Sequence, residues 1–244
     1  MSETIIFGRN PVVEAIKSGQ KLEKVFLLQG LTGEVEVQVR KACSQHNIPM
    51  TKVPNRRLNE MAKHSNHQGV IAYISPVEYT SVDKLIPEIQ TKGEVPLMVV
   101  LDGITDVRNM GAIARSAKVF GAHGLVIPAK GTARVSDDMV KSSAGAILHI
   151  PICRENSLPV ALETMQQLGL TVYATNVRAT KTISEVDLKV PTAIILGSED
   201  LGVSRKAIQI ADESIKIPQA DEFDSLNVSV SAGILLYEVL LQRI

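Results

Sequence analysis

Residues 97–120 read LMVVLDGITDVRNMGAIARSAKVF, and this stretch decides the fold class. Its first five residues are apolar without alternation, which is typical of a strand buried on both faces. A short polar loop follows, and from Asn109 to Phe120 apolar residues recur at helical spacing. A buried strand that leads through a loop into a helix is the repeating unit of a parallel α/β sheet.

The same alternation continues through the rest of the sequence. It predicts further strands over 124–127, 149–152, 171–174, 193–197 and 214–217, and helices over 136–143, 158–168, 204–211 and 227–243. We expect a mainly parallel sheet with helices on both faces. Such sheets bind ligands at the carboxyl ends of their strands, which directs attention to the loops after Leu101, Ala174, Gly197 and Ile217.

Residues 1–75 are expected to form a separate small α/β domain. Short apolar runs alternate there with amphipathic stretches, which predicts helices over 10–18, 34–46 and 55–64 and strands over 24–28, 49–53 and 69–75. Asn10 and Pro11 are the expected N-cap and first residue of the first helix. Residues 76–96 contain three prolines, so we expect a linker over 76–95 and a second domain over 96–244.

Composition excludes several classes of protein. The 244 residues carry 26 basic and 26 acidic side chains, so the net charge is zero and a protein that binds nucleic acid through a large overall positive charge is excluded. The charge is unevenly distributed, because residues 1–75 have ten basic against six acidic side chains. The two cysteines are 110 positions apart and belong to no Cys/His cluster, so we expect no metal site and a reducing, cytoplasmic location. We also expect no membrane association, because no segment has the roughly 20 apolar residues of a span.

Three segments contain residues suited to chemistry. On the helix that begins near Asn109, the basic residues Arg108, Arg115 and Lys118 recur on one face, and small residues let a ligand approach the backbone. A phosphate would suit this face, although solvated surface charges are the simpler interpretation of isolated arginines. Residues 193–204, AIILGSEDLGVS, form a buried strand followed by two glycines that enclose two acids. Turn glycines with solvated acids are the alternative there.

The third segment is residues 215–238, in which Ser225 or Asn227 caps a strongly apolar helix. Capping alone would also explain both residues. None of the sixteen glycines forms a G-x-G pair, and no G-K-[ST] sequence occurs. The sequence therefore offers no support for a nucleotide-dependent oxidoreductase or for a P-loop protein.

Together the three segments resemble the motifs of the SpoU (TrmH-like) family of SPOUT RNA 2′-O-ribose methyltransferases. The motifs are N-x-G-A-I-x-R at 109–115, L-G-x-E-x-x-G at 196–202, and I-P at 217–218 followed by S-L-N-V at 225–228. The opening residues 6–16, IFGRNPVVEAI, resemble the N-terminal substrate-binding domain of the RlmB-like subgroup. That domain is similar to kink-turn-binding ribosomal proteins.

The resemblance implies S-adenosylmethionine as methyl donor, 2′-O-ribose methylation of RNA, a homodimer, and a trefoil knot in the second domain. It favours a guanosine of 23S rRNA in the peptidyl-transferase region as target. A tRNA or another rRNA nucleotide is the alternative within the family. A non-catalytic, RNA-binding ribosome-assembly factor is the alternative outside it, and intact motifs argue against that.

The resemblance also implies roles for individual residues. The expected catalytic residues are Arg115, Asn109, Glu199, Ser225 and Asn227. The expected donor-binding residues are Thr175, Asn176, Gly197, Ile217 and Leu226. The expected RNA-binding residues are Arg9, Arg108 and Arg115. Because a guanidinium pKa lies above about 12, we expect Arg115 to position RNA and stabilise charge, with Glu199 close enough to orient it.

Overall fold

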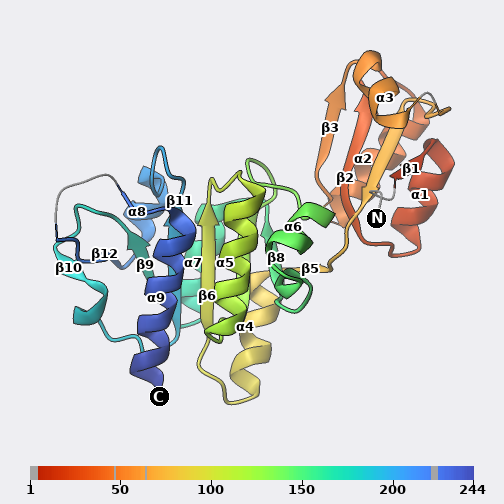
Figure 1. Cartoon of the computed structure of the whole chain (residues 1–244). Coiled ribbons are helices and arrows are strands. Elements are labelled where there is room, and N and C mark those ends of the chain that lie inside the picture. Colours follow the sequence, from red (N-terminus) through yellow and green to blue (C-terminus); the bar gives the residue numbers. More distant parts are fainter. Residues whose placement is uncertain (1–4, 47, 64, 221–224) are drawn as a thin grey trace. The chain divides into compact units, whose positions relative to one another are not determined.

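The computed structural model describes residues 5–46, 48–63, 65–220 and 225–244. The chain divides into two compact units, each with its own sheet (Figure 1). The first unit comprises residues 1–78 and 134–137, and the second comprises residues 79–133 and 138–244.

The first unit has a four-stranded sheet of order β1-β4-β2-β3. Its strands are β1 (Ile5–Phe7), β2 (Leu22–Leu28), β3 (Met50–Val53) and β4 (Val70–Ile74). Helices α1 (Arg9–Lys17) and α2 (Glu34–Gln45) cover one face, and α3 (Asn55–Ala62) covers the other. Alternate residues of β4 enter the two cores, as the period of a strand requires.

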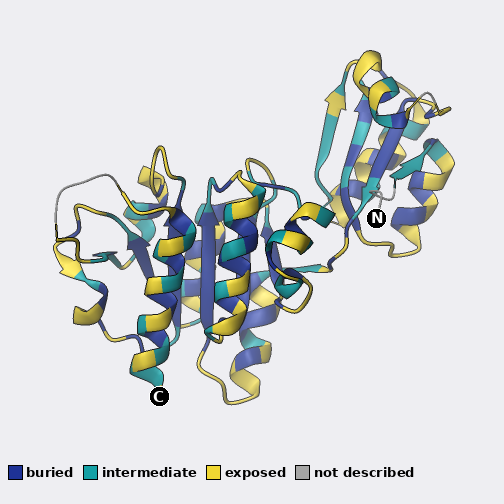
Figure 2. Cartoon of the chain, viewed as in Figure 1, coloured by how far each residue is buried: buried dark blue, intermediate teal, exposed yellow. Residues whose placement is uncertain are grey.

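The second unit has an eight-stranded sheet of order β10-β12-β9-β11-β6-β7-β8-β5, in which every pair is parallel. Its strands are β5 (Tyr79–Thr80), β6 (Leu97–Asp102), β7 (Gly124–Pro128), β8 (Ile152–Glu155), β9 (Thr171–Thr175), β10 (Lys181–Thr182), β11 (Thr192–Gly197) and β12 (Glu213–Lys216). The predicted parallel sheet is therefore confirmed. Figure 2 shows its central strands buried on both faces, which explains their uninterrupted apolar sequence.

Helices cover both faces of this sheet. Helices α4 (Val82–Thr91), α7 (Leu158–Gln167) and α8 (Arg205–Ile210) share one core with β6, β9 and β11. Helices α5 (Val107–Val119) and α9 (Val228–Arg243) lie side by side on the other face (Figure 1). The remaining helices are α6 (Asp137–Ser142), η1 (Ala146–Leu148) and η2 (Ile183–Glu185).

The structure corrects three details of the sequence-based expectation. Most of the expected linker 76–95 belongs to the second unit, because β5 pairs with β8 and α4 buries its apolar face in the core. Helix α1 begins at Arg9 after Gly8, so Asn10 is not its N-cap. Strand β8 starts three residues later than expected, because η1 and its flanking turn occupy the preceding segment.

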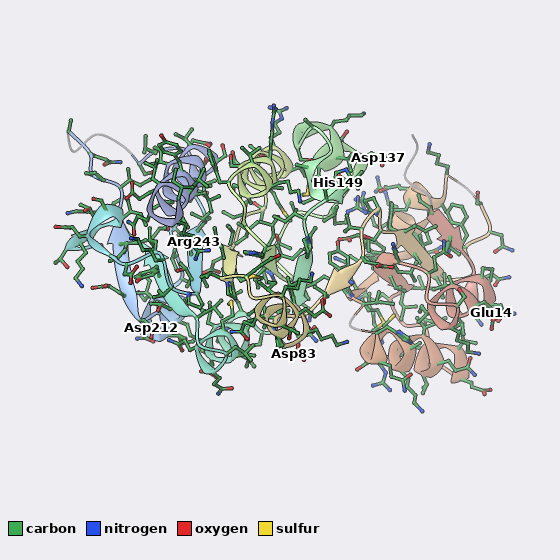
Figure 3. The ribbon with its side chains drawn as sticks, turned by 90° about the horizontal axis from the view of Figure 1, so that it is seen from below. Glu14, Asp83, Asp137, His149, Asp212 and Arg243 are labelled. Atoms are coloured by element: carbon green, nitrogen blue, oxygen red, sulfur yellow. The ribbon has the colours of Figure 1, made fainter. Side chains whose placement is uncertain are left out.

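Arg243 anchors the C-terminal end of α9 (Figure 3). Its guanidinium donates to four main-chain carbonyls, those of Leu188 at 2.8 Å, Val95 and Val190 at 2.9 Å, and Pro96 at 3.3 Å. Burial lowers the pKa of this guanidinium from its ordinary value. The last turn of α9 is thereby fixed to the loops that precede β6 and β11.

Candidate functional site

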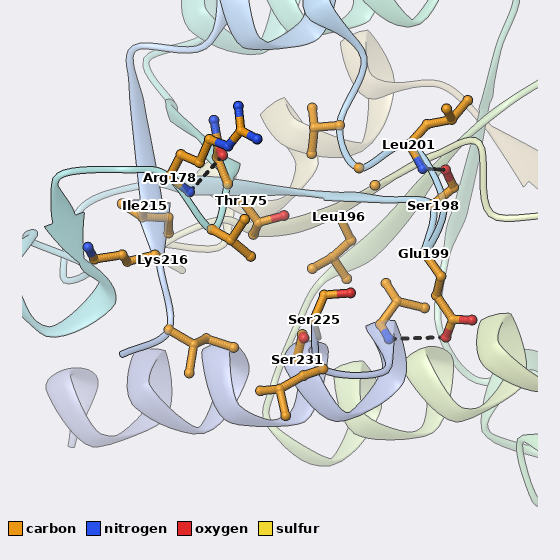
Figure 4. Close-up of a pocket in the computed structure, with 18 of the residues that line it drawn as sticks. Thr175, Arg178, Leu196, Ser198, Glu199, Leu201, Ile215, Lys216, Ser225 and Ser231 are labelled. Atoms are coloured by element: carbon orange, nitrogen blue, oxygen red, sulfur yellow. Dashed lines mark hydrogen bonds between the residues drawn. The ribbon is translucent and has the colours of Figure 1, made fainter. Parts of the chain in front are cut away.

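A pocket of about 440 Å³ lies at the carboxyl ends of β9, β11 and β12, where sheets of this type bind ligands (Figure 4). The start of α9 closes its remaining side. Its wall contains the buried apolar residues Leu196, Val203, Ile215, Val228 and Leu235. The pocket therefore combines an apolar interior with polar loops at its mouth.

The loop after β11 folds back on itself beside this pocket. The Gly202 amide donates to the Ser198 carbonyl at 2.8 Å, and the Leu201 amide donates to Ser198 Oγ at 3.2 Å. A Cβ at Gly197 would lie 2.0 Å from the Gly202 carbonyl carbon and 2.1 Å from the Val203 nitrogen. Position 197 can therefore carry no side chain while the loop keeps this shape.

Glu199 is hydrogen-bonded to two of the other predicted catalytic residues, Asn109 and Asn227. Its Oε1 accepts hydrogen bonds from Asn109 Nδ2 at 3.2 Å, from Asn227 Nδ2 at 2.5 Å and from the Val228 amide at 3.4 Å. Asn227 Nδ2 also donates to Asn109 Oδ1 at 3.1 Å. Asn109 lies 90 positions before Glu199 in the sequence, and Asn227 lies 28 positions after it. The fold thus brings side chains from three distant segments together.

The positions of Asn109 and Asn227 depend on helix caps. Helix α5 starts at Val107, and Asp106 caps it by accepting from the Arg108 and Asn109 amides at 2.8 Å. The expected start at Asn109 is wrong by two residues, so the Asn109 side chain is free to reach Glu199. Asn227 caps α9 by accepting from the Ser229 amide at 2.9 Å, as the sequence predicts.

Arg115 does not join the Glu199 cluster. It is exposed on α5, and its side chain has no hydrogen bond to any residue in the described part of the chain. Six residues separate it from Asn109, which turns it about 240° around the helix and moves it about 9 Å along the axis. The expected contact between Glu199 and Arg115 is therefore not formed within one chain. Arg108, also exposed, lies two turns away on the same face as Arg115.

The predicted donor-binding residues and Ser225 all line the pocket. They are Thr175, Asn176, Gly197, Ile217, Leu226 and Ser225. Two of them are fixed to neighbouring strands, because Thr175 Oγ1 donates to the Ile195 carbonyl at 2.8 Å and the Asn176 amide donates to the Ile215 carbonyl at 2.9 Å.

Arg9, the remaining predicted RNA contact, lies in the first unit. Its Nε donates to the Gln68 carbonyl at 2.9 Å, and its amide donates to Gln68 Oε1 at 3.4 Å. These two bonds fix the base of the guanidinium at the start of α1. The terminal amino groups carry the remaining donors of the guanidinium.

One sequence-based prediction about α5 is wrong, and two residues near the site were not predicted. The small residues of α5 were expected to expose its backbone to a ligand, but a Cβ at Gly111 would lie 2.0 Å from Ser142 Oγ, so α6 fills that space. Asp102, which accepts from the Ser204 amide at 2.8 Å, and the pocket residue Arg178 were not predicted. The signal for Arg178 was its place two residues after Asn176 in a strand-end loop.

The described residues form neither a metal-binding cluster nor a membrane-spanning helix. Among residues 5–46, 48–63, 65–220 and 225–244, no three His, Cys, Asp or Glu side chains gather as metal ligands would. Within the same ranges, no helix is both long and apolar enough to cross a membrane.

This fold and site define a class of RNA-modifying protein. Residues 96–237 match the SpoU rRNA Methylase family, and residues 5–80 match the family of RNA 2′-O ribose methyltransferase substrate-binding domains. The chain belongs to the SpoU family, whose members are RNA 2′-O-methyltransferases that use S-adenosylmethionine.

Individual relatives agree with this assignment. The putative TrmH family tRNA/rRNA methyltransferase YacO of Bacillus subtilis is 36% identical over 238 residues, covering 98% of this chain and 95% of YacO. The SpoU methyltransferase AviRb from Streptomyces viridochromogenes, crystallised with the cofactor AdoMet, has a TM-score of 0.62 at 24% identity, covering 99% of this chain and 90% of AviRb. A crystal structure described as an RNA 2′-O ribose methyltransferase has a TM-score of 0.57 at 28% identity. The match covers 99% of this chain and 89% of the other.

The pocket fits the family's methyl donor on several grounds. Its volume lies within the range of about 300–1,000 Å³ that is usual for small-molecule sites. Leu196 and Ile215 offer apolar surface for a purine ring, and the strand-end loops present main-chain groups to its polar edge. Exposed Glu199 and Asp200 at the same mouth suit a ligand that carries a positive sulfonium and ammonium group.

Proposed function

We propose that this protein transfers the methyl group of S-adenosylmethionine to the 2′-oxygen of a guanosine in the peptidyl-transferase region of 23S rRNA. The observation that carries the proposal is the meeting of Asn109, Glu199 and Asn227 beside the strand-end pocket. The opening sequence 6–16, which resembles the RlmB-like subgroup, supports the choice of RNA. Such a substrate implies an activity in the cytoplasm.

The roles of the clustered residues follow from their hydrogen bonds. The bound donor supplies an electrophilic methyl group on a positive sulfur. Glu199 holds the amides of Asn109 and Asn227, and it is also a candidate acceptor for the proton of the ribose hydroxyl. Ser225, with one hydroxyl in the pocket lining, can donate and accept a hydrogen bond near the same position.

Arg115 and Arg108 are assigned to the RNA backbone. Both are exposed, and they stand two turns apart on one face of α5. A guanidinium presents a planar pair of donors that matches phosphate geometry. Arg115 held against the phosphate next to the target ribose would orient the 2′-oxygen and stabilise negative charge on it.

The first unit is assigned to capture of the RNA. Arg9 is fixed by Gln68 while its terminal amino groups remain as donors, and residues 1–75 carry an excess of four basic side chains. Helix α3 adds Arg56 and Arg57, which share Glu60 as ion-pair partner. Phosphate contacts from such a surface position an RNA without reading its sequence.

We also propose a homodimer formed through α9. Four apolar side chains stand exposed along one stripe of this helix, namely Val230 (50%), Ile234 (39%), Tyr237 (51%) and Leu241 (45%). A helix that is apolar on its outer face as well as its inner face is typical of a buried element. Sedimentation of the purified protein is expected to give twice the chain mass of 26.4 kDa, and a single 26.4 kDa species would contradict the dimer.

The trefoil knot is proposed on the strength of the family resemblance, with α9 as the threaded segment. A trace of the backbone in an experimental structure tests it directly. An unthreaded path between β11 and the end of α9 would contradict the knot.

The proposed activity is tested by methyl transfer to defined RNAs. We expect the purified protein, given radiolabelled S-adenosylmethionine, to label 23S rRNA from cells that lack the protein, and not rRNA from cells that contain it. Mapping of ribose methylation should then find one guanosine in the peptidyl-transferase region. Label in tRNA or at another rRNA nucleotide would support the family assignment and contradict the proposed target. No label in either RNA would contradict the activity.

A further inference from the structure

The turn after β9 places an arginine at the mouth of the donor pocket. The Ala179 amide donates to the Asn176 carbonyl at 2.9 Å, and the Arg178 amide donates to Asn176 Oδ1 at 2.9 Å. Asn176 is itself bonded through its amide to Ile215 of β12. The backbone that carries Arg178 is therefore held by two adjacent strands.

Arg178 is a lining residue of the pocket, and its side chain is exposed. Figure 4 shows it at the rim near Thr175, with its guanidinium beside the turn. Lys216 is the other basic residue in the lining, but its ammonium group points away from the centre of the pocket in the same view. Within the described residues, Arg178 is thus the cation best placed to meet a bound anion.

The methyl donor has one anionic group, the α-carboxylate of its methionine part. Its adenine suits the apolar wall, and its two positive groups suit the acids at the mouth. The carboxylate needs a cationic or N–H partner, because a desolvated charge without one is costly. We propose that Arg178 binds this carboxylate through the planar donor pair of its guanidinium, an inference that rests on the donor assigned above.

The test compares two ligands that differ only in that group: S-adenosylmethionine and decarboxylated S-adenosylmethionine. Dissociation constants are measured by calorimetry without RNA. Arg178→Ala is expected to weaken S-adenosylmethionine binding about tenfold and to change binding of the decarboxylated ligand less than about twofold. For Arg178→Lys, the dissociation constant for S-adenosylmethionine is expected to lie between those of the wild-type protein and Arg178→Ala. Lysine keeps the positive charge but lacks the planar donor pair of the guanidinium.

The matched control is Lys216→Ala, which removes a positive charge close to the same pocket. We expect it to leave the ratio of the two dissociation constants unchanged. Equal weakening of both ligands by Arg178→Ala would show that Arg178 shapes the turn, and unchanged binding of S-adenosylmethionine by this variant would place the carboxylate elsewhere. Either result overturns the proposal. Failure of the wild-type protein to bind either ligand would instead contradict the donor itself.

Discussion

Replacement of Arg115 by alanine is expected to lower methyl transfer to RNA by about 100-fold or more. The reason is that orientation of the ribose and stabilisation of charge on its oxygen both depend on this guanidinium in the proposed mechanism. Binding of S-adenosylmethionine should change by less than about twofold, because Arg115 is not among the residues that line the pocket. Single-turnover transfer and calorimetry measure the two effects separately.

Two further variants make the Arg115 result specific. Arg115→Lys keeps the positive charge without the donor fork, and we expect it to recover only a small part of the activity. Lys141→Ala removes an exposed charge from α6, and we expect wild-type transfer. Full activity in Arg115→Ala would contradict the assigned role, and a parallel loss of donor binding would mean that Arg115 supports the pocket instead.

Replacement of Gly197 by alanine is expected to abolish donor binding, with an increase in the dissociation constant of about 100-fold or more. The added Cβ would lie 2.0 Å from the backbone of Gly202, and backbone atoms cannot move aside as a flexible side chain can. The loop from Ser198 to Gly202 must then leave the position that forms one wall of the pocket. Calorimetry with S-adenosylmethionine measures the effect.

A glycine far from the pocket provides the control. Gly121 has a φ of +78°, and nothing lies within 4 Å of a Cβ built there. Gly121→Ala should therefore lose stability of order 1 kcal/mol from backbone strain while binding the donor normally. Normal donor binding by Gly197→Ala would show that the loop adapts and that its observed shape is not required.

The sequence predicted the sheet and the meeting of the motifs well, for a physical reason. Buried strands such as β6 begin with an uninterrupted apolar run, here five residues before Asp102, so their pattern alone identifies them. The three motifs follow the parallel strands β6, β11 and β12, and the carboxyl ends of parallel strands lie at the same edge of a sheet. The contacts of Glu199 with Asn109 and Asn227 could therefore be expected from the positions of the motifs.

Features that depend on tertiary pairing were not predictable. Strands Tyr79–Thr80 and Lys181–Thr182 have two residues each and exist only because a neighbouring strand provides their hydrogen bonds. The small residues of α5 were expected to face a ligand, and only the packing of Ser142 against Gly111 shows that α6 occupies the space beside Gly111. The separation of Arg115 from Glu199, in contrast, follows from helical geometry alone, because six residues turn a helix by about 240° and place Arg115 on a different face from Asn109.

Helix α9 is held at both of its ends. Its N-cap Asn227 is hydrogen-bonded to Glu199, and Arg243 in its last turn is hydrogen-bonded to four main-chain carbonyls. Its sixteen residues extend about 24 Å as a stiff rod, with the exposed apolar stripe between the two attachments. The surface proposed for the homodimer and the Asn227 amide that bonds to Glu199 therefore belong to one rigid element. In the proposed homodimer, a second copy packed on this stripe would immobilise the same helix that positions Asn227.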